Sequence, residues 1–429
     1  MVERSQHLEQ PNPVLILTIA NGAGHIRVAQ GIAAAIHSTQ PSMPVMVVDI
    51  ADYMTHLMRF THVTSYLWLV KHAPAAWDRI DRYQKKQTHT SPEWYYRKGC
   101  SRLFKLARQV QPRALIASEV GCCEVAALIK RDLGLRVPLI AINDDFQADR
   151  AWVQPEVDLY SFVTDDLGEE LISHGAPRER VVGWGASLSS GFDVALDREK
   201  EREDVCQWLD LNPRLPLVLI AGGGEGMGRI EETTKRLLDL QRPAAQLVVL
   251  TGRNQRAKLR CEQLARKGAS KRLRVLGWMG PELMPKLMSA ADLMVSKLGI
   301  MFHEAMASEL PIIALTPPPG SERVQHQLLD EWNVGRGVRT LEELVETVAR
   351  LLSEPGELSE MREQTRARCK RFVSQRIARW LAETLGGQNA DLIDPDREAR
   401  LYALYANTEQ YRNVSMTEYE CSEGSLCDS

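Results

Sequence analysis

Short runs of consecutive apolar residues alternate along the chain with longer segments in which apolar residues recur every three or four positions. The first run, at residues 14–20, is followed by a glycine-rich turn and by a helical pattern at 26–37. The same order restarts with the apolar run at 216–221. Short apolar runs between helices are typical of parallel strands buried on both faces. The pattern therefore predicts an α/β chain with two doubly wound sheets. Further strands are predicted at 45–49, 114–117, 138–142, 159–163, 247–251, 273–276, 293–295 and 312–315.

The charged segment 197–204 separates the two series of strands and helices. We expect a first domain at residues 1–195, a second domain at 196–385, and an acidic tail at 386–429 that is partly helical and then disordered. Ligands of open parallel sheets bind at the carboxyl ends of the strands. Two such sheets that face one another would place a site in the cleft between them.

The turn at 222–228 reads Gly-Gly-Gly-Glu-Gly-Met-Gly and lies between an apolar run and a helical pattern that begins near Ile230. Glycines let backbone N–H groups approach a phosphate closely, and a helix N-terminus adds partial positive charge. The turn lacks the Gly-Lys-Ser/Thr ending of a P-loop and the acidic ribose partner of a dinucleotide fingerprint. It therefore predicts a cradle for a diphosphate.

Composition agrees with a globular protein, since 44% of the 429 residues are hydrophobic and 25% are charged. No apolar run approaches the roughly 20 residues of a membrane span, and the run at 14–20 lacks the flanks of a signal peptide. The eight cysteines include no Cys-x-x-Cys pair, so neither a zinc site nor a disulfide framework is expected. These features predict a cytoplasmic protein without a metal or a nucleic-acid partner.

Residues 66–77 are rich in aromatic and aliphatic side chains, and the segment 79–113 that follows is strongly basic. An apolar face beside basic residues suits a helix that lies in the interface of an anionic bilayer. We therefore expect peripheral contact with a membrane. A core helix followed by a solvated basic helix would give the same composition and stays open as an alternative. The candidate membrane contacts are Tyr66, Trp68, Trp77, Lys85 and Lys86.

An ordered set of short motifs between about residues 14 and 352 resembles the monogalactosyldiacylglycerol synthase family. The resemblance implies a GT-B fold, in which two Rossmann-like domains face one another across a cleft. It also implies an inverting hexosyltransferase, a galactosyltransferase in that family, that uses a UDP-sugar and diacylglycerol or a related lipid without an essential catalytic metal. The motifs are Asn21-Gly22-Ala23-Gly24-His25, residues 65–74, Asp145-Phe146, Trp152-Val153, Thr251-Gly252-Arg253-Asn254, Gly277-Trp278-Met279, Ser296-Lys297-Leu298-Gly299, His303-Glu304-Ala305 and Gly320-Ser321-Glu322.

The resemblance implies roles for residues on the donor side. Glu304 would hydrogen-bond the two ribose hydroxyls, the backbone at Trp278 and Met279 would contact the uracil, and Lys297 would offset diphosphate charge. The other implied donor-site residues are Gly222, Gly223, Gly224, Gly226, Gly252, Arg253, Asn254, Ser296, Gly299, His303, Gly320, Ser321, Glu322 and Gln325, with Gly22 and Gly24 in the loop on the acceptor side.

Two residues of the first half are candidates for the catalytic base. His25 follows Gly24 at the start of a predicted helix, and imidazole titrates near neutral pH. Asp145 follows the predicted strand 138–142 and is either a competing base or a group that orients His25. Asp144 and Asp145 are not expected to form a metal site, because adjacent side chains at a strand end point to opposite faces.

Some motifs depart from the family pattern. Lys297-Leu298-Gly299-Ile300 lacks a second turn glycine, and Gly320-Ser321-Glu322 followed by Gln325 replaces residues that contact sugar hydroxyls in the family. The sugar is therefore left open. Three alternatives to a lipid hexosyltransferase remain: a transferase for a polyprenyl or natural-product acceptor, a UDP-sugar 2-epimerase, and an inactive donor-binding scaffold.

Overall fold

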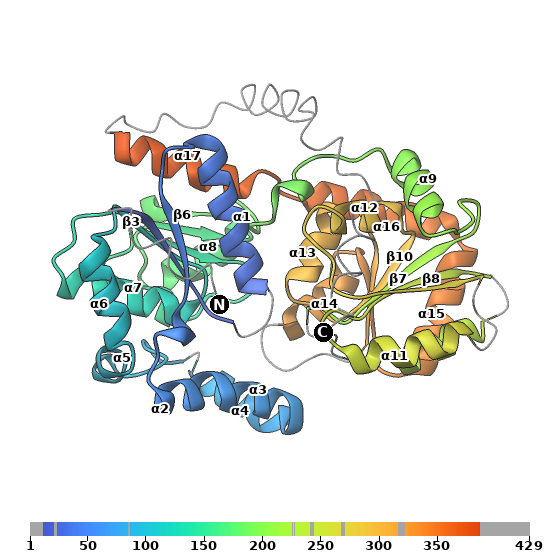
Figure 1. Ribbon diagram of the computed structural model, residues 1–429, viewed down its shortest axis with the longest axis horizontal. Helices are drawn as coiled ribbons and strands as arrows, with labels where there is room; N and C mark the ends of the chain where they lie inside the picture. The colour runs from blue at the N-terminus through green and yellow to red at the C-terminus, as the bar shows by residue number, and fades with distance from the viewer. Residues whose placement is uncertain are drawn as a thin grey trace, which may run out of the picture.

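The computed structural model describes residues 12–20, 24–84, 86–224, 226, 228–240, 244–266, 271–315 and 322–386. These residues form two six-stranded sheets in which all neighbouring strands are parallel (Figure 1). The prediction of two doubly wound α/β sheets is confirmed. The first sheet has the order β2 (Val45–Asp49), β1 (Val14–Thr18), β3 (Ala114–Ala117), β4 (Leu139–Asn143), β5 (Leu159–Phe162) and β6 (Val181–Val182), and the second has the order β12 (Gly335–Val338), β11 (Ile312–Leu315), β10 (Leu293–Ser296), β7 (Leu217–Ala221), β8 (Gln246–Leu250) and β9 (Leu273–Leu276).

Both faces of the first sheet are covered, which explains its apolar strands. Val14 and Ile16 of β1 pack with Val28 and Ile32 of α1 (Gly24–Thr39), whereas the alternate residues of β1 belong to the core on the other face. That second core includes buried residues of α6 (Ser101–Val110) and α7 (Val120–Asp132). The other helices of this domain are α5 (Glu93–Gly99) and α8 (Asp165–Ser173).

The second sheet is covered in the same way. Val218 and Ile220 of β7 pack with α10 (Ile230–Leu238) and α15 (Leu341–Ser353). The alternate residues of β7 join the core that contains α12 (Met284–Ala290) and α13 (Ile300–Ala307). The remaining helices are α9 (Arg198–Trp208), α11 (Gln255–Leu264), α14 (Glu322–Glu331) and α16 (Pro355–Arg368).

The last described helix, α17 (Val373–Gly386), returns to the first domain and lies beside α1 (Figure 1). Its residues Val373, Ile377 and Leu381 lie one turn apart on one face and are buried in the core with β1 and α1. The predicted second domain at 196–385 therefore contains a helix that packs on the first domain. The acidic tail and its possible further helix lie outside the described residues.

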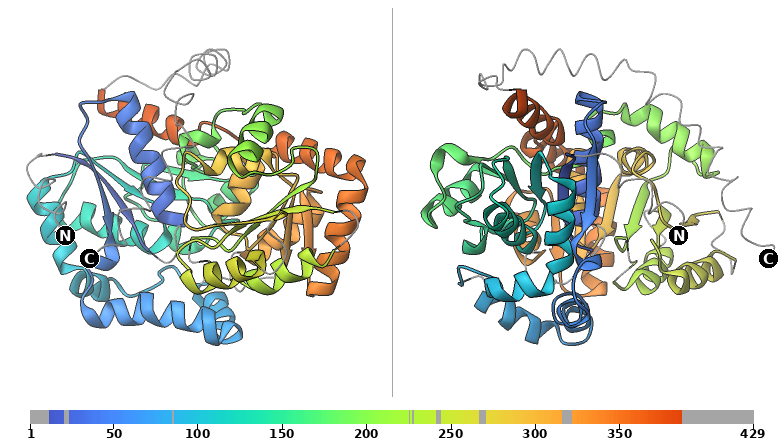
Figure 2. Two further views of the ribbon diagram at one scale, coloured as in Figure 1. Left: turned by 45° about the vertical axis from the view of Figure 1, so that its right-hand side comes forward. Right: turned by 60° about the vertical axis from the view of Figure 1, so that its left-hand side comes forward.

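Three short helices project from the first domain: α2 (His56–Arg59), α3 (Ser65–His72) and α4 (Pro74–Gln84) (Figures 1 and 2). An ion pair between Asp78 of α4 and Arg323 of α14 joins this projection to the second domain. Within the described ranges, every helix is too short or too polar to cross a membrane.

Candidate active site

The glycine-rich turn between β7 and α10 depends on backbone conformations that glycine adopts easily. Gly223, Gly226 and Gly228 have φ angles of 69°, 55° and 92°. A Cβ on Gly226 would lie 2.0 Å from the carbonyl oxygen of Thr251, and one on Gly252 would lie 2.4 Å from that of Gly224. The loops that follow β7 and β8 are therefore packed too closely for side chains at these positions.

Hydrogen bonds lock the two loops together. The backbone N–H of Arg253 donates to the carbonyl of Gly224 at 2.9 Å, and the Asn254 amide donates to the carbonyl of Gly226 at 3.0 Å. The Asn254 side chain also accepts from Ala257 N–H at the start of α11. The structure thus places Asn254 in support of the turn.

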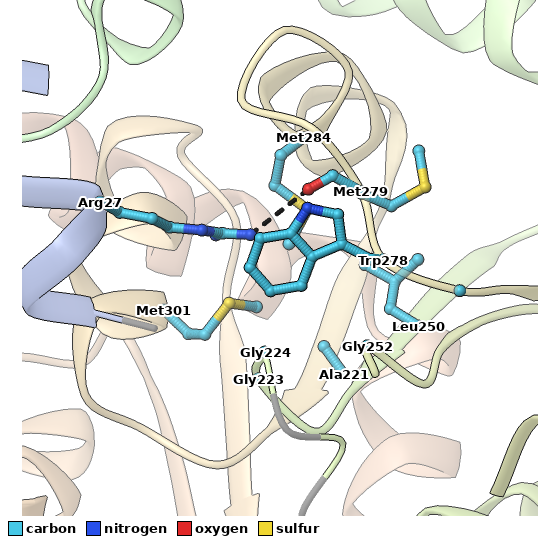
Figure 3. Close-up of a pocket in the computed structure, with 11 residues that line it drawn as sticks. Arg27, Ala221, Gly223, Gly224, Leu250, Gly252, Trp278, Met279, Met284 and Met301 are labelled. Atoms are coloured by element: carbon cyan, nitrogen blue, oxygen red, sulfur yellow. Dashed lines mark hydrogen bonds between the residues drawn. The ribbon is translucent and has the colours of Figure 1, made fainter. Parts of the chain in front are cut away.

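A pocket opens between this turn and α1 (Figure 3). Gly223, Gly224 and Gly252 line its floor, and Trp278 and Met279 line its side. The Arg253 guanidinium lies 4.3 Å from the centre of the Trp278 ring, on which it forms a cation–π contact. These predicted donor-side residues meet at one place, although they follow three different strands.

Glu304 of α13 is buried next to the pocket residue Arg27, with only 3% of its surface exposed. Its Oε1 accepts a hydrogen bond of 3.0 Å from Arg27, whereas its Oε2 is buried and has no partner among the described residues. Burial raises the pKa of Glu304, and the Arg27 charge opposes this. A buried carboxylate oxygen without a partner is costly in the free protein and is therefore a good acceptor for a ligand hydroxyl.

Lys297 brings a positive charge to the turn. A Cβ on Gly223 would lie 3.0 Å from Cε of Lys297, and the Lys297 ammonium lies 3.3 Å from Oε1 of Glu322. Ser296, which ends β10, donates its hydroxyl hydrogen to the Lys297 carbonyl at 2.6 Å. The cation of Lys297 is thus held beside the predicted diphosphate cradle.

Two predicted donor-side residues are used elsewhere in the structure. Gln325 is buried and accepts from the N–H of Gly299 at 2.6 Å, so its amide fixes the turn before α13. His303 stacks on Phe146 at 5.1 Å and lies 2.8 Å from the Asp144 carbonyl. Burial lowers the pKa of His303 to about 4, so its neutral ring donates to that carbonyl at the contact between the domains.

His25 lies in the first turn of α1, with Nδ1 3.0 Å from the carbonyl oxygen of Ser118, which follows β3. A carbonyl oxygen can only accept, so Nδ1 carries the hydrogen and Nε2 of the neutral ring keeps its lone pair. A Cβ on Gly24 would lie 3.6 Å from Cβ of Ile300, so this end of α1 faces the start of α13. In the neutral form of His25, Nε2 is therefore the ring nitrogen that can accept a proton, at the end of α1 that faces α13.

Asp145 does not orient His25, because the Ser118 carbonyl takes the Nδ1 hydrogen. The Asp145 backbone N–H donates to the Asn143 side chain at 2.8 Å, and no described residue donates a hydrogen bond to its carboxylate. Asp144 accepts from the N–H of Ser187 at 2.9 Å, and burial raises its pKa to about 7. Asp145 therefore remains a second candidate base.

The predicted membrane residues divide between two sides of the projection. Tyr66 and Trp77 are partly buried and meet edge to face at 4.8 Å, and burial and the nearby carboxylates of Glu322 and Asp145 raise the pKa of Tyr66. Tyr66 and Trp68 are two residues apart on α3, and residues two apart on a helix point in different directions. Trp68 is 58% exposed, and Lys86 is exposed as well. Further exposed apolar residues between positions 57 and 83 are Leu57, Phe60, Leu67, Ile80 and Tyr83.

Sequence analysis also missed Arg27. Its guanidinium bonds Glu304 and the Met279 carbonyl, at 3.0 and 3.4 Å, and lies 4.9 Å from the centre of the Trp278 ring (Figure 3). The only sequence signal was its position three residues after Gly24, on the helix face that carries that glycine. The predicted residues Gly22, Gly320, Ser321 and Lys85 lie outside the described residues.

Both halves of the chain are similar to known glycosyltransferase families. Residues 25–187 match monogalactosyldiacylglycerol (MGDG) synthase, and residues 226–354 match glycosyl transferases group 1. The processive diacylglycerol beta-glucosyltransferase of Bacillus cytotoxicus is 26% identical over 360 residues, which are 82% of this chain and 89% of that protein. The resemblance predicted from the motifs is therefore confirmed.

Solved structures share the fold. Anabaena HepE in complex with UDP superposes with a TM-score of 0.51 at 15% identity, covering 87% of this chain and 100% of that one. The UDP-GlcNAc 2-epimerase of Neisseria meningitidis bound to UDP-GlcNAc superposes with a TM-score of 0.55 at 14% identity, covering 87% and 100%. The two facing doubly wound domains form the GT-B fold, as predicted.

Proposed function

We propose that this protein is an inverting glycosyltransferase that moves a hexose from a UDP-sugar to a hydroxyl group of diacylglycerol. One observation carries the proposal: His25, whose Nδ1 is held by the Ser118 carbonyl, lies on the domain that faces a glycine-lined pocket, and the pocket residue Arg27 bonds Glu304, a buried carboxylate with one unpartnered oxygen. The relatives that match most of the chain are named as diacylglycerol glucosyltransferases, which supports the acceptor class.

The donor would bind in the pocket of the second domain. Oε2 of Glu304 would accept from a ribose hydroxyl, and backbone N–H groups of Gly223 and Gly224 would donate to the diphosphate beside Lys297. Negative charge grows on the leaving UDP as the bond to the sugar breaks, so donors that are already in place stabilise the transition state. These groups supply that stabilisation from the protein itself, and we propose that activity persists in EDTA.

The acceptor would react from the side of the first domain. His25 Nε2 would take the proton of the lipid hydroxyl while its oxygen attacks the anomeric carbon and UDP departs. A single displacement of this kind inverts the configuration at that carbon. The bond from Nδ1 to Ser118 holds the ring in the tautomer that this step requires.

For the sugar, we propose glucose rather than galactose. The match to MGDG synthase covers residues 25–187, which lie in the first domain and include none of the residues on the donor pocket's floor. The donor half matches only a general glycosyltransferase family. The relatives that span both halves are named as glucosyltransferases.

We further propose that the exposed apolar residues of α2 to α4 touch the membrane that holds the acceptor. Leu57, Phe60 and Trp68 are 67%, 61% and 58% exposed, which is unusual for side chains of this size. Arg79, Arg82 and Lys86 lie on or just after α4 and would attract anionic lipid headgroups. The partners of the protein would then be a UDP-hexose, diacylglycerol and an anionic membrane surface.

A donor-by-acceptor panel tests the proposal. Purified protein is incubated with UDP-glucose, UDP-galactose or UDP-GlcNAc and with liposomes that contain or lack diacylglycerol, each with and without EDTA, and products are identified by mass spectrometry. We expect glucosyl-diacylglycerol from UDP-glucose both with and without EDTA. Conversion of UDP-GlcNAc to its 2-epimer would favour the epimerase alternative, and no product from any pair would favour the scaffold.

A further inference from the structure

Arg27 reaches across the cleft from α1 and ends inside the donor pocket (Figure 3). Its two terminal nitrogens donate to different groups of the second domain, Nη1 to Oε1 of Glu304 at 3.0 Å and Nη2 to the Met279 carbonyl at 3.4 Å. Its planar head also lies over the Trp278 ring at 4.9 Å. The guanidinium therefore satisfies one acceptor on α13 and one in the loop after β9, and it covers an aromatic face.

These three partners are the groups that the donor nucleoside would use. Glu304 offers acceptors to the ribose diol, and the segment at Trp278 and Met279 is the predicted contact of the base. A guanidinium is flat and carries several N–H donors, so it can replace a flat heterocycle and a diol at the same surfaces. Oε2 of Glu304 has no partner and could accept one ribose hydroxyl, but the second hydroxyl of the diol would need Oε1, which already accepts from Arg27. The nucleoside and Arg27 would therefore compete for this carboxylate.

We propose that Arg27 occupies the nucleoside subsite of the free protein and that the UDP part of the donor must displace it to bind. This inference rests on the proposed function of the pocket as a UDP-sugar site. Arg27 would then set the affinity for the donor, and its release would break a contact between the domains at the moment when the donor enters.

The charges explain why the arginine takes this position. Only 4% of the Glu304 side chain is exposed, and a buried carboxylate without a counter-charge is unfavourable. Arg27 supplies that charge while it keeps 18% of its own side chain exposed, so it can withdraw toward the solvent without a large rearrangement. An incoming ribose would bring hydroxyl donors to Glu304 and compensate for the loss of the arginine.

Titration calorimetry with UDP tests the inference on the full-length chain. The variants are Arg27→Ala, Arg27→Gln, which keeps a neutral donor near Glu304, and Gln30→Ala, a control at an exposed position of α1. A charge-assisted hydrogen bond no longer has to be broken in Arg27→Ala, so we expect its UDP affinity to rise by roughly ten-fold. The UDP affinity of Arg27→Gln should rise by less, and the UDP affinity of Gln30→Ala should equal that of the wild type.

The outcomes separate this inference from the proposed function. A wild-type protein that binds no UDP would refute the pocket assignment itself. A wild type that binds UDP, with Arg27→Ala and Arg27→Gln binding equally or more weakly, would overturn only the role of Arg27. Thermal unfolding of each variant confirms that the protein under test is folded.

A double-mutant cycle gives an independent reading. Removing Glu304 from the wild type also breaks the bond that holds Arg27 in the pocket. UDP then no longer has to break that bond, and this offsets part of the affinity lost with the Glu304 contact. Glu304→Ala should therefore cost more UDP affinity in the Arg27→Ala background than in the wild type. An equal or smaller cost in that background would show that Arg27 does not compete with UDP for Glu304.

Discussion

Replacement of His25 by asparagine separates its two ring nitrogens. An asparagine amide can donate to the Ser118 carbonyl from nearly the position of Nδ1, which lies 3.0 Å from that oxygen. The variant therefore keeps the hydrogen bond that fixes the ring but has no group at the place of Nε2. If Nε2 is the base, turnover should fall by about a hundred- to ten-thousand-fold, which corresponds to roughly 3–5 kcal/mol of transition-state free energy.

The assay compares turnover and donor binding in the same preparations. Turnover is measured with saturating UDP-glucose and diacylglycerol liposomes, and UDP affinity is measured by calorimetry. We expect His25→Asn to bind UDP within about two-fold of the wild type, because no described donor-pocket contact involves His25. Asp145→Asn serves as the comparison, since Asp145 is the other candidate base.

The reasoning would be refuted by the reverse pattern. If Asp145→Asn abolishes turnover while His25→Asn retains most of it, Asp145 is the base and His25 only joins α1 to the end of β3. If His25→Asn loses turnover and UDP affinity in parallel, His25 acts in donor binding, and the hydrogen bond to Ser118 serves to position it there.

Three further predictions follow from single contacts. Glu304→Gln should weaken UDP binding by about ten- to a hundred-fold, and unchanged affinity in calorimetry would remove Glu304 from the site. Trp68→Ser should reduce sedimentation with anionic diacylglycerol liposomes by about ten-fold, whereas Leu259→Ser on α11, also 58% exposed, should have no effect; equal loss in both would argue against a specific face. Burial raises the pKa of Asp144 from 3.8 to about 7, so the folded chain holds that proton more tightly and its stability declines as the pH rises from about 4 to 7. Asp144→Asn should therefore raise the free energy of unfolding by about 1–3 kcal/mol at pH 8 and by progressively less toward pH 4, and denaturant titrations that show no difference at pH 8 would contradict this.

The fold could be predicted because its signals are local. The apolar strands of both sheets appear in the sequence as short apolar runs, and the turn at 222–228 appears as a cluster of glycines. In the structure, three of these glycines have positive φ angles. The position of α17 could not be predicted, for the opposite reason. The apolar face of α17 indicates that it is buried, but the sequence does not say that α1 and β1, more than 300 residues earlier, provide the core.

Several residues predicted for the donor side meet at one pocket, but the structure gives others different partners. Gln325 and His303 have residue types that suit sugar or phosphate contacts, yet the first is bonded to Gly299 and the second to the Asp144 carbonyl. Tyr66 was grouped with Trp68 because both are aromatic and close in sequence. On the helix they face different sides, and only Trp68 is exposed.

Arg27 shows why such roles need the structure. Its charge and its place on α1 would suit a solvated helix face equally well, and its partner Glu304 lies 277 positions away in the chain. What distinguishes it is that one guanidinium meets a carboxylate, a carbonyl and an aromatic ring that belong to the other domain. The role proposed for His25 depends on the same kind of information, since the Ser118 carbonyl identifies Nδ1 as the ring nitrogen that donates. In a site between two domains, the sequence of each domain shows which polar side chains it contributes. The contacts between the domains determine which of these side chains are already bonded, so that a ligand must displace their partners.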